Sequence, residues 1–527
     1  MSHISSISAP GTSLSHSLPL TTHRPLRVPP VPPATSSRLT SLTTPRDEKD
    51  QVTILSGTEH GRTLGTPISL FVPNQNVRPK DYKEMSIVPR PGHADYTYQA
   101  KYGVRASSGG GRSSARETIG RVAAGAVADI WLGQALGTRV VAWVTRVGDV
   151  ALPEDALSGI RGEGARSDTD AGPGTLTRED VDKYGQLRVL RDPSSWRQVA
   201  LGGGEGEAAT EEARVALQDE VDASSEALFV GDDDAATAAE DPQADSTSPA
   251  YEGYDGTIYD RAGRDVTKEG SNSDAAFLAK ARTDELVHVR CPHGPTAARM
   301  ATLIRRVRVS HDSIGGVVTC VCSGVSVGLG EPCFDKLEAS LAHGMMSLPA
   351  TKGFEIGSGF EGTRLRGSKH NDAFTKHEDG LPLLATKTNR AGGTLGGIST
   401  GANLEFRVAV KSVSTIARAQ DTADFTGKDT VLAAKGRHDP CVLPRTPPLI
   451  EAMASMVLMD HALAQMARVT STNAMLEPGR SNACYFPVTT VDTRHAEGNT
   501  AGGTRTDGGG SETKEGDGPM AKRAKNS

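Results

Sequence analysis

Aromatic residues and long apolar runs are scarce in this sequence. Only 4% of the 527 residues are Phe, Trp or Tyr and 36% are hydrophobic, whereas 58 residues are glycine. This composition indicates a folded core that is diluted by low-complexity segments. No apolar run is long enough to cross a bilayer, so we expect no membrane partner.

An excess of positive charge and a metal-binding pattern of cysteines are also absent. The net charge of −6 gives no basic footprint, so we expect no nucleic-acid partner. Cys320 and Cys322 lie in an expected strand, and no C-x-x-C pair accompanies them. We therefore predict no metal site. The cysteines are better explained as reduced, structural thiols of a cytoplasmic protein.

The first 40 residues are rich in Ser, Thr and Pro and contain no acidic residue, since Asp47 is the first in the chain. Such a composition is typical of a transit peptide. The prolines of RPLRVPPVPPA, however, oppose the amphipathic helix that many transit peptides form. We predict that residues 1–40 are disordered, and targeting to an organelle is the alternative to a cytoplasmic location.

A second segment of unusual composition lies in the middle of the chain. Between Leu201 and Ala250 there are fourteen acidic residues and one arginine, separated by Gly, Ala and Ser. This segment has too little apolar surface to fold alone, so we predict a solvated insertion, with a partner-binding acidic arm as the alternative. The predicted division is a disordered Ser/Pro-rich N-terminus (1–40), a first part of the folded domain (41–183), a low-complexity acidic insertion (184–288), a second part (289–476) and a disordered tail (477–527).

In several stretches outside these segments, apolar residues recur at the spacing of a strand or a helix. RVVAWVTRVG and GGVVTCVCSGV are expected strands, and DKLEASLAHGMMSL is an expected helix. In NLEFRVAVKSVSTI every second residue is apolar, which predicts a strand that ends at Lys411 beside a hydroxyl-rich turn. A long helix, PLIEAMASMVLMDHALAQMARV, closes the folded part, and four of its side chains are expected in the core: Leu449, Met453, Met456 and Val457.

A loop rich in glycine, serine and arginine precedes another expected helix. Ser114 and Glu117 have the spacing of a capping box, so the helix should begin near Ser114. Glycines 109–111, the free N–H groups of the first helical turn, Arg112 and Arg116 could together hold an anion such as phosphate. A flexible loop before an ordinary helix is the alternative. The stretch lacks both the G-K-[ST] of a Walker A loop and the G-x-G-x-x-G of a dinucleotide fold, so a phosphate-loop NTPase is a weak hypothesis.

Long collinear blocks resemble one known family. RPGHADYTYQAKYGVRASSGGGRSSARETIGRVAAGA is similar to chorismate synthases, and the similarity recurs further along the chain. The later blocks are DSIGGVVTCV, GLGEPCFDKLEASLAHGMMSLPATKGFEIGSGF, GSKHND, TNRAGGTLGGISTGANLEFRVAVKSVSTI and KGRHDPCVLPRTPPLIEAMA. They extend from about Ser41 to Arg468 outside the insertion, and several are most similar to fungal members.

The resemblance implies a fold, a reaction and a cofactor. The fold would be a single α+β domain of helices packed on antiparallel-rich β-sheets, interrupted by the long disordered acidic insertion. The family converts 5-enolpyruvylshikimate 3-phosphate to chorismate by a 1,4-elimination of phosphate, with reduced FMN as cofactor. Flavin reduction by NADPH is a further expectation from the fungal members, and a homotetramer is the expected assembly. The flavin-contacting positions of the family fall on Arg112, Ser113, Ser114, Pro349, Ala350, Gly396, Lys411, Ser412, Val413, Ser414, Thr415 and Arg437.

Two further residues match positions to which the family assigns chemistry. The resemblance implies that His93 protonates the reduced flavin, and a histidine suits this role because its pKa lies near neutrality. It implies that Asp439 works with flavin N5 to remove the ring proton. Without the motifs, His93 would be read as a hydrogen-bonded structural histidine and Asp439 as the ion-pair partner of an arginine such as Arg437.

One block of the family pattern is not found. The sequence contains no G-E-S-H-G motif, and its GTEHG stretch matches a later family segment, so no catalytic role is carried to His60. Arg46 is a candidate remnant of the anion site. A faulty gene model, a splice form and a protein that has lost catalysis are the alternatives. We expect this chain to have little or no lyase activity, and a flavin-binding or scaffold protein of the same fold is the alternative function.

Overall fold

The computed structural model describes residues 50–74, 84–105, 115–154, 156, 176–190, 250–253, 257–259, 263–264, 282–376, 384–434 and 438–476. All of them lie in the first of two units of the chain, Met1–Pro487, and the second, Val488–Ser527, is outside the described residues.

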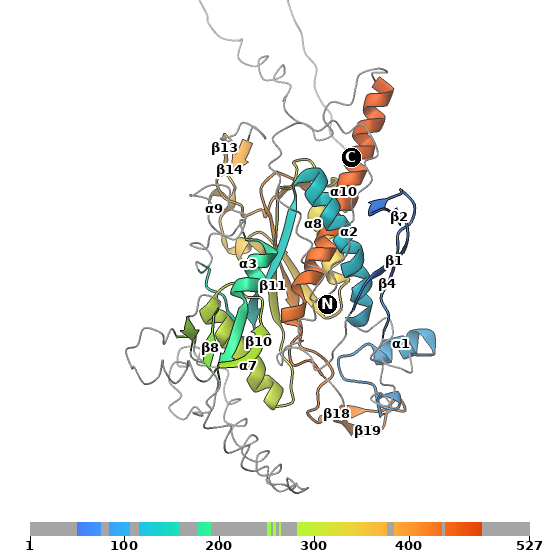
Figure 1. The fold of residues 1–527 in the computed structure, drawn as a ribbon, viewed down its shortest axis with the longest axis vertical. Helices are drawn as coiled ribbons and strands as arrows, with labels where there is room; N and C mark the ends of the chain where they lie inside the picture. The colour runs from blue at the N-terminus through green and yellow to red at the C-terminus, as the bar shows by residue number, and fades with distance from the viewer. Residues whose placement is uncertain are drawn as a thin grey trace, which may run out of the picture. The chain divides into compact units, whose positions relative to one another are not determined.

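An antiparallel sheet of five strands, in the order β12-β17-β11-β5-β6, forms the centre of the first unit (Figure 1). The alternation predicted for β17 is confirmed, because its first, third, fifth and seventh residues are buried and the residues between them are half-buried. The predicted strands at β5 and β11 are confirmed too. The strands are β5 (Arg139–Val147), β6 (Val150–Ala151), β11 (Gly316–Ser323), β12 (Thr351–Ile356) and β17 (Leu404–Val410).

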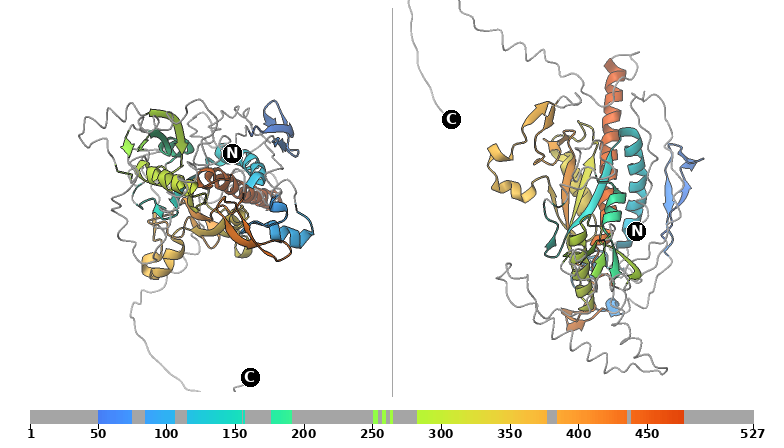
Figure 2. Two further views of the ribbon diagram at one scale, coloured as in Figure 1. Left: turned by 90° about the horizontal axis from the view of Figure 1, so that it is seen from below. Right: turned by 60° about the vertical axis from the view of Figure 1, so that its left-hand side comes forward.

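Helices cover both faces of this sheet. On one face α2 (Thr118–Leu136) and α10 (Pro447–Leu476) lie side by side against β5, and α8 (Leu337–Met346) packs on α10 and β12 (Figures 1 and 2). A Cβ atom on Gly125 would come within 2.4 Å of the Ala452 Cβ, so the glycine sets how closely α2 approaches α10. On the other face α3 (Arg178–Tyr184) lies against β5, and its Val181 packs with Trp143.

The residues of α10 that face the core lie one position further along the chain than the predicted ones. The fully buried apolar residues of the helix have a spacing of four and are Ile450, Ala454, Leu458 and Ala462. Leu449, Met453 and Val457 are only partly buried at the border of the core, and Met456 is half-buried outside the core cluster. The reason is that α10 is enclosed by both α2 and the sheet, so small residues such as alanine occupy the tightest contacts.

Part of the range predicted as an insertion, 184–288, forms paired strands. Its two edges pair with each other in a second antiparallel sheet, in the order β10-β7-β8-β9, on which α7 (Gly294–Val309) packs. The strands are β7 (Gln186–Leu190), β8 (Ala250–Glu252), β9 (Ile258–Tyr259) and β10 (Arg282–His288). Residues 191–249, the two termini and 265–281 lie outside the described residues, so the rest of the predicted division stays a prediction.

Short elements complete the described part of the chain. No helix in it is long and apolar enough to span a membrane. The elements are β1 (Thr53–Ser56), β2 (Thr58–Glu59), β3 (Arg62–Thr63), β4 (Ser69–Phe71), α1 (Asp95–Tyr102), α9 (Gly367–His370), β13 (Phe374–Lys376), β14 (Leu384–Thr386), β15 (Thr394–Leu395), β16 (Ile398–Ser399), β18 (Gln420–Ala423) and β19 (Asp429–Leu432).

Candidate active site

The loop that carries His93 lies against the turn that follows strand β17. Gly92 has a φ of +66°, and a Cβ atom there would lie 3.3 Å from both Lys411 Nζ and Ser414 Oγ. Lys411 Nζ and Ser414 Oγ each donate a hydrogen bond of 2.7 Å to the Gly92 carbonyl oxygen. The glycine therefore allows two segments to meet that are 319 residues apart in the sequence.

A buried ion pair supports the His93 ring. Arg90 donates from Nε to Asp95 Oδ2 at 2.7 Å and from Nη2 to Asp95 Oδ1 at 2.9 Å. His93 Nδ1 lies 3.0 Å from Arg90 Nη2 and 3.1 Å from Asp95 Oδ1. Burial opposes ionisation of Asp95, but the hydrogen bonds and charges of Arg90 and His93 outweigh it and hold the pKa of Asp95 far below its ordinary value.

The turn after β17 presents a cation and hydroxyl groups to this loop. Lys411 Nζ donates to Ser414 Oγ at 2.6 Å, and Arg90 Nη1 donates to Thr415 Oγ1 at 3.2 Å. Burial lowers the pKa of Lys411, and the nearby Lys352 lowers it further. Within the described residues neither lysine has a carboxylate at ion-pair distance, so an anion would complement this turn.

The predicted flavin position at Pro349 and Ala350 lies next to the same turn. Ala350 adopts a left-handed φ of 69°, and its carbonyl oxygen accepts a hydrogen bond of 2.9 Å from the Lys411 N–H. A non-glycine residue in this conformation is uncommon and costs conformational energy, and such strain is frequent at functional sites.

The start of helix α2 also reaches this region. A 3-10 turn, Ala115–Glu117, leads into α2, close to the helix start predicted from the sequence. Arg121 of α2 donates to the Ser347 hydroxyl at 2.5 Å and to the Ser347 carbonyl at 3.1 Å, just before Pro349. The residues that come before the turn, including Arg112, Ser113 and Ser114, lie outside the described residues.

Asp439 is connected to the turn after β17 through a third segment. Ser313 donates to the Val413 carbonyl at 2.6 Å, and the Ile314 N–H donates to the Pro440 carbonyl at 2.9 Å. Asp439 itself accepts a hydrogen bond of 2.8 Å from Arg445 Nη1. Among the described residues the arginine partner of Asp439 is Arg445, and Arg437 lies outside them.

Gly396 is a predicted site residue that no contact among the described residues joins to this cluster. It lies with a φ of 63° in the hairpin between β15 and β16, where the Gly397 carbonyl accepts a hydrogen bond from the Leu337 N–H at the start of α8. Pro349 and Ala350 follow the far end of α8, and a helix of ten residues is about 15 Å long. No contact in the described part of the chain links Gly396 to the His93 loop.

The sequence interpretation did not single out Arg90, Asp95, Ser313 or Arg445. A signal for the first two was present, because they flank His93 in RPGHAD as one positive and one negative residue. His60 is exposed in the turn between β2 and β3, with a solvent-accessible fraction of 92% for its side chain.

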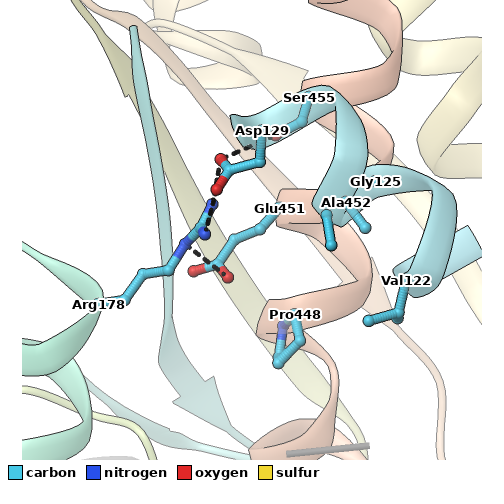
Figure 3. A pocket seen from close by; sticks show the side chains of 9 residues that line it. Val122, Gly125, Asp129, Arg178, Pro448, Glu451, Ala452 and Ser455 are labelled. Atoms are coloured by element: carbon cyan, nitrogen blue, oxygen red, sulfur yellow. Dashed lines mark hydrogen bonds and ion pairs between the residues drawn. The ribbon is translucent and has the colours of Figure 1, made fainter. Parts of the chain in front are cut away.

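A small pocket elsewhere is a feature of the helix packing. It lies among α2, α3 and α10, has a volume of about 20 Å³ and contains none of the predicted site residues (Figure 3). Such a volume holds roughly one water molecule. The described residues also include no cluster of three or more His, Cys, Asp or Glu side chains that could hold a metal ion.

A family model described as Chorismate synthase matches residues 33–463. The chain belongs to the chorismate synthase family. The chorismate synthase of Schizosaccharomyces pombe is 44% identical over 82% of this chain and 86% of its own length. Those of Saccharomyces cerevisiae and Neurospora crassa are 41% and 42% identical, over 81% and 82% of this chain and 84% and 82% of their own lengths.

Membership of the chorismate synthase family confirms the predicted α+β fold and the function. The chain is an FMN-dependent carbon-oxygen lyase of the shikimate pathway, and its substrate is 5-enolpyruvylshikimate 3-phosphate. The described residues fit a phosphorylated flavin, because Lys411 and Lys352 lie close enough to repel each other and hydroxyl groups adjoin Lys411.

Proposed function

We propose that the His93 loop, the Lys411–Thr415 turn, Pro349–Ala350 and Asp439 form the active site in which phosphate and a ring proton are eliminated. The observation that carries the proposal is the pair of hydrogen bonds from Lys411 and Ser414 to the Gly92 carbonyl. They hold the candidate acid beside a cationic turn. The remaining family positions, Arg112, Ser113, Ser114, Gly396 and Arg437, are proposed to contact FMN as well.

The chemistry of each residue follows from its surroundings. His93 Nδ1 is occupied by Arg90 and Asp95, and Nε2 has no hydrogen-bond partner among the described residues, so Nε2 is the atom that delivers a proton. Asp439, held by Arg445, is the carboxylate that assists removal of the ring proton. Lys411 stabilises negative charge on bound phosphate. Reduced FMN, when bound, supplies electron density to the allylic system of the substrate.

Anaerobic turnover of 5-enolpyruvylshikimate 3-phosphate with reduced FMN tests the assignment, in whichever of two chains turns over: the 527-residue chain or the same chain with a G-E-S-H-G block before residue 41. H93Q and D439N should each lower kcat by about 10²- to 10⁴-fold, the usual contribution of a positioned acid or base. Both variants should still bind FMN, measured by quenching of flavin fluorescence. Unchanged kcat in either variant would remove that residue from the mechanism.

The same assay tests the expectation of weak activity in this sequence. It compares the 527-residue chain with a chain that carries a G-E-S-H-G block before residue 41. Activity only in the second chain supports a role for that block. Equal activity in the two chains contradicts the expectation.

NADPH-dependent flavin reduction is proposed as a second activity, on the ground of the similarity to fungal members. The purified chain, mixed anaerobically with oxidised FMN and NADPH, should bleach the flavin absorbance without an added reductase. A flavin spectrum that does not change over the time of the turnover assay would contradict this activity.

A homotetramer is the proposed assembly. Exposed apolar side chains on the hairpins β13–β14 and β15–β16 support self-association: Phe374, Leu384, Leu395 and Ile398. Light scattering coupled to size-exclusion chromatography measures the mass, and a monomer mass would refute this assembly.

The cytoplasm is the proposed compartment. The five described cysteines are free thiols and four of them are buried, as expected in a reducing environment. A fluorescent fusion at the C-terminus that enters an organelle would favour targeting by residues 1–40 instead.

A further inference from the structure

His93 Nδ1 lies within hydrogen-bond distance of two groups that offer opposite partners. Arg90 Nη2, at 3.0 Å, can only donate a hydrogen bond, whereas Asp95 Oδ1, at 3.1 Å, can only accept one when ionised. A protonated Nδ1 therefore donates to Asp95, and a deprotonated Nδ1 accepts from Arg90. The imidazolium and both neutral tautomers each have a partner in the same ring position.

The two partners are themselves fixed. The side chains of Arg90 and Asp95 are only 8% and 4% exposed, and two parallel hydrogen bonds join them. Arg105 Nη1 lies 3.6 Å from Asp95 Oδ1, and Arg90 Nη1 also donates to Thr415. Arg90 thus connects the ring of His93 to the turn that carries Lys411.

We infer that Arg90 and Asp95 are positioning residues that keep the His93 ring in place while Nε2 gives up and regains a proton. This inference rests on the proposed role of His93. Starting from the imidazolium, the Nε2 proton leaves to the bound acceptor, and the Nδ1 proton stays on the hydrogen bond to Asp95. Reprotonation at Nε2 restores the imidazolium, so the ring does not rotate in the cycle.

Loss of Arg90 and loss of Asp95 should move the pH profile of activity in opposite directions. The Asp95 carboxylate stabilises a positive charge on the His93 ring, and the Arg90 guanidinium beside the ring opposes it, as do the cations Arg105, at Asp95, and Lys411, at the Gly92 carbonyl. Where the charged ring is the active form, activity falls on the alkaline side of the profile. D95N should move this fall to lower pH by about one unit, and R90M should move it to higher pH. R90K keeps the charge and should remain near the wild-type position.

The experiment is the pH dependence of kcat between about pH 5.5 and 9, in anaerobic turnover with reduced FMN. D95N, R90M, R90K and H93Q are made in the chain that turns over, with or without a G-E-S-H-G block before residue 41, and that chain without the substitutions is the wild type of the comparison. E361Q is the control, because it removes an exposed carboxylate paired only with exposed Arg364, and it should leave the profile unchanged. We expect kcat at neutral pH to fall about tenfold in D95N, while FMN still binds. Where D95N does not fold, R90M and R90K give the direction of the shift by themselves.

Opposite shifts in D95N and R90M support the inference, because a purely structural defect would lower kcat without moving the midpoint in a charge-dependent direction. A second outcome is that H93Q abolishes this part of the profile while the midpoints of D95N and R90M stay at the wild-type pH. This outcome would overturn the positioning role and leave the proposed role of His93 in place. A profile that persists unchanged in H93Q would overturn the proposed role of His93 and this inference with it.

Discussion

Replacement of Arg178 by methionine should destabilise the fold more than the loss of any surface ion pair. Arg178 donates to both oxygens of Asp129 at 2.8 Å and to the Val140 carbonyl at 2.9 Å, and its Nε forms an ion pair with Glu451 Oε2 at 3.0 Å. Figure 3 shows the guanidinium between the two carboxylates, which come from α2 and α10. R178M therefore leaves two negative charges at the contact between these helices without their cation.

The magnitude follows from how much water reaches each carboxylate. Breaking a buried ion pair costs about 3–5 kcal/mol. Glu451 is 6% exposed and still accepts a hydrogen bond from the Ala142 N–H, whereas Asp129 is 24% exposed and keeps Ser455 as a donor. Because Asp129 can be hydrated, we expect the lower end of that range, about 3 kcal/mol near pH 7.

The cost should also depend on pH. Burial raises the pKa of Glu451 above its ordinary value, although Arg178 and Arg290 oppose this effect. A carboxyl whose pKa is raised by folding destabilises the folded state as pH rises through that pKa. Loss of Arg178 removes an opposing charge, so the pKa of Glu451 rises further. The penalty of R178M should therefore be smaller at pH 5 than at pH 7, and the added substitution E451Q should recover part of it at pH 7.

Urea unfolding of the apoprotein, followed by circular dichroism at both pH values, measures these differences. The matched control is R364M, which removes an exposed arginine paired with exposed Glu361 and should cost under about 1 kcal/mol. If R178M were no less stable than R364M, or its penalty did not change with pH, the buried charges of Glu451 and Asp129 would not be the cause and the reasoning would be refuted.

Three further predictions concern the candidate active site. G92V should lower turnover and weaken FMN binding, because a β-branched residue is strained at φ +66° and would push against Lys411 and Ser414. G103V is the control for backbone strain, because Gly103 has a similar φ and a Cβ atom added there meets no atom within 4 Å. K411M should raise the Kd for FMN about tenfold or more in a fluorescence titration, and K369M, on the short helix α9, should leave it unchanged. The stability that ionised Asp95 contributes is present above its ordinary pKa of about 3.9 and is lost as pH falls below it, so wild type should lose more stability than D95N between about pH 5 and pH 3 in urea unfolding.

The central sheet could be predicted from the sequence because its strands carry their own signal. β17 alternates in polarity, and β5 and β11 are short apolar runs, so each is recognisable without its neighbours. β7 and β10 are different. Each is a short run beside a low-complexity segment, and its burial comes from pairing with the other strand across that segment. Tertiary pairing of this kind leaves no local period, so the sequence does not predict these two strands.

The residues of the candidate site could be predicted from the sequence, but the contacts between them could not. Pro349, Lys411 and His93 follow from the resemblance, but the contact between Gly92 and Lys411 depends on how the end of β17 lies beside a loop from the first part of the domain. The supporting pair Arg90 and Asp95 has no periodic signal at all. Its function becomes visible only when both side chains are found on the same nitrogen of His93.

Arg178, which is half-buried, and Arg90, which is buried, have different kinds of partners. The difference separates a structural network from a network that can take part in proton transfer. Arg178 is bound by two carboxylates and a carbonyl, all of which are acceptors, so its network is satisfied in one protonation state only. Arg90 is bound by Asp95 and Thr415 and also faces a histidine nitrogen, which can donate or accept. Only the second network keeps every partner satisfied when a proton is gained or lost near neutral pH. This property, rather than burial or charge, makes the Arg90 network the one expected to affect the pH dependence of the reaction.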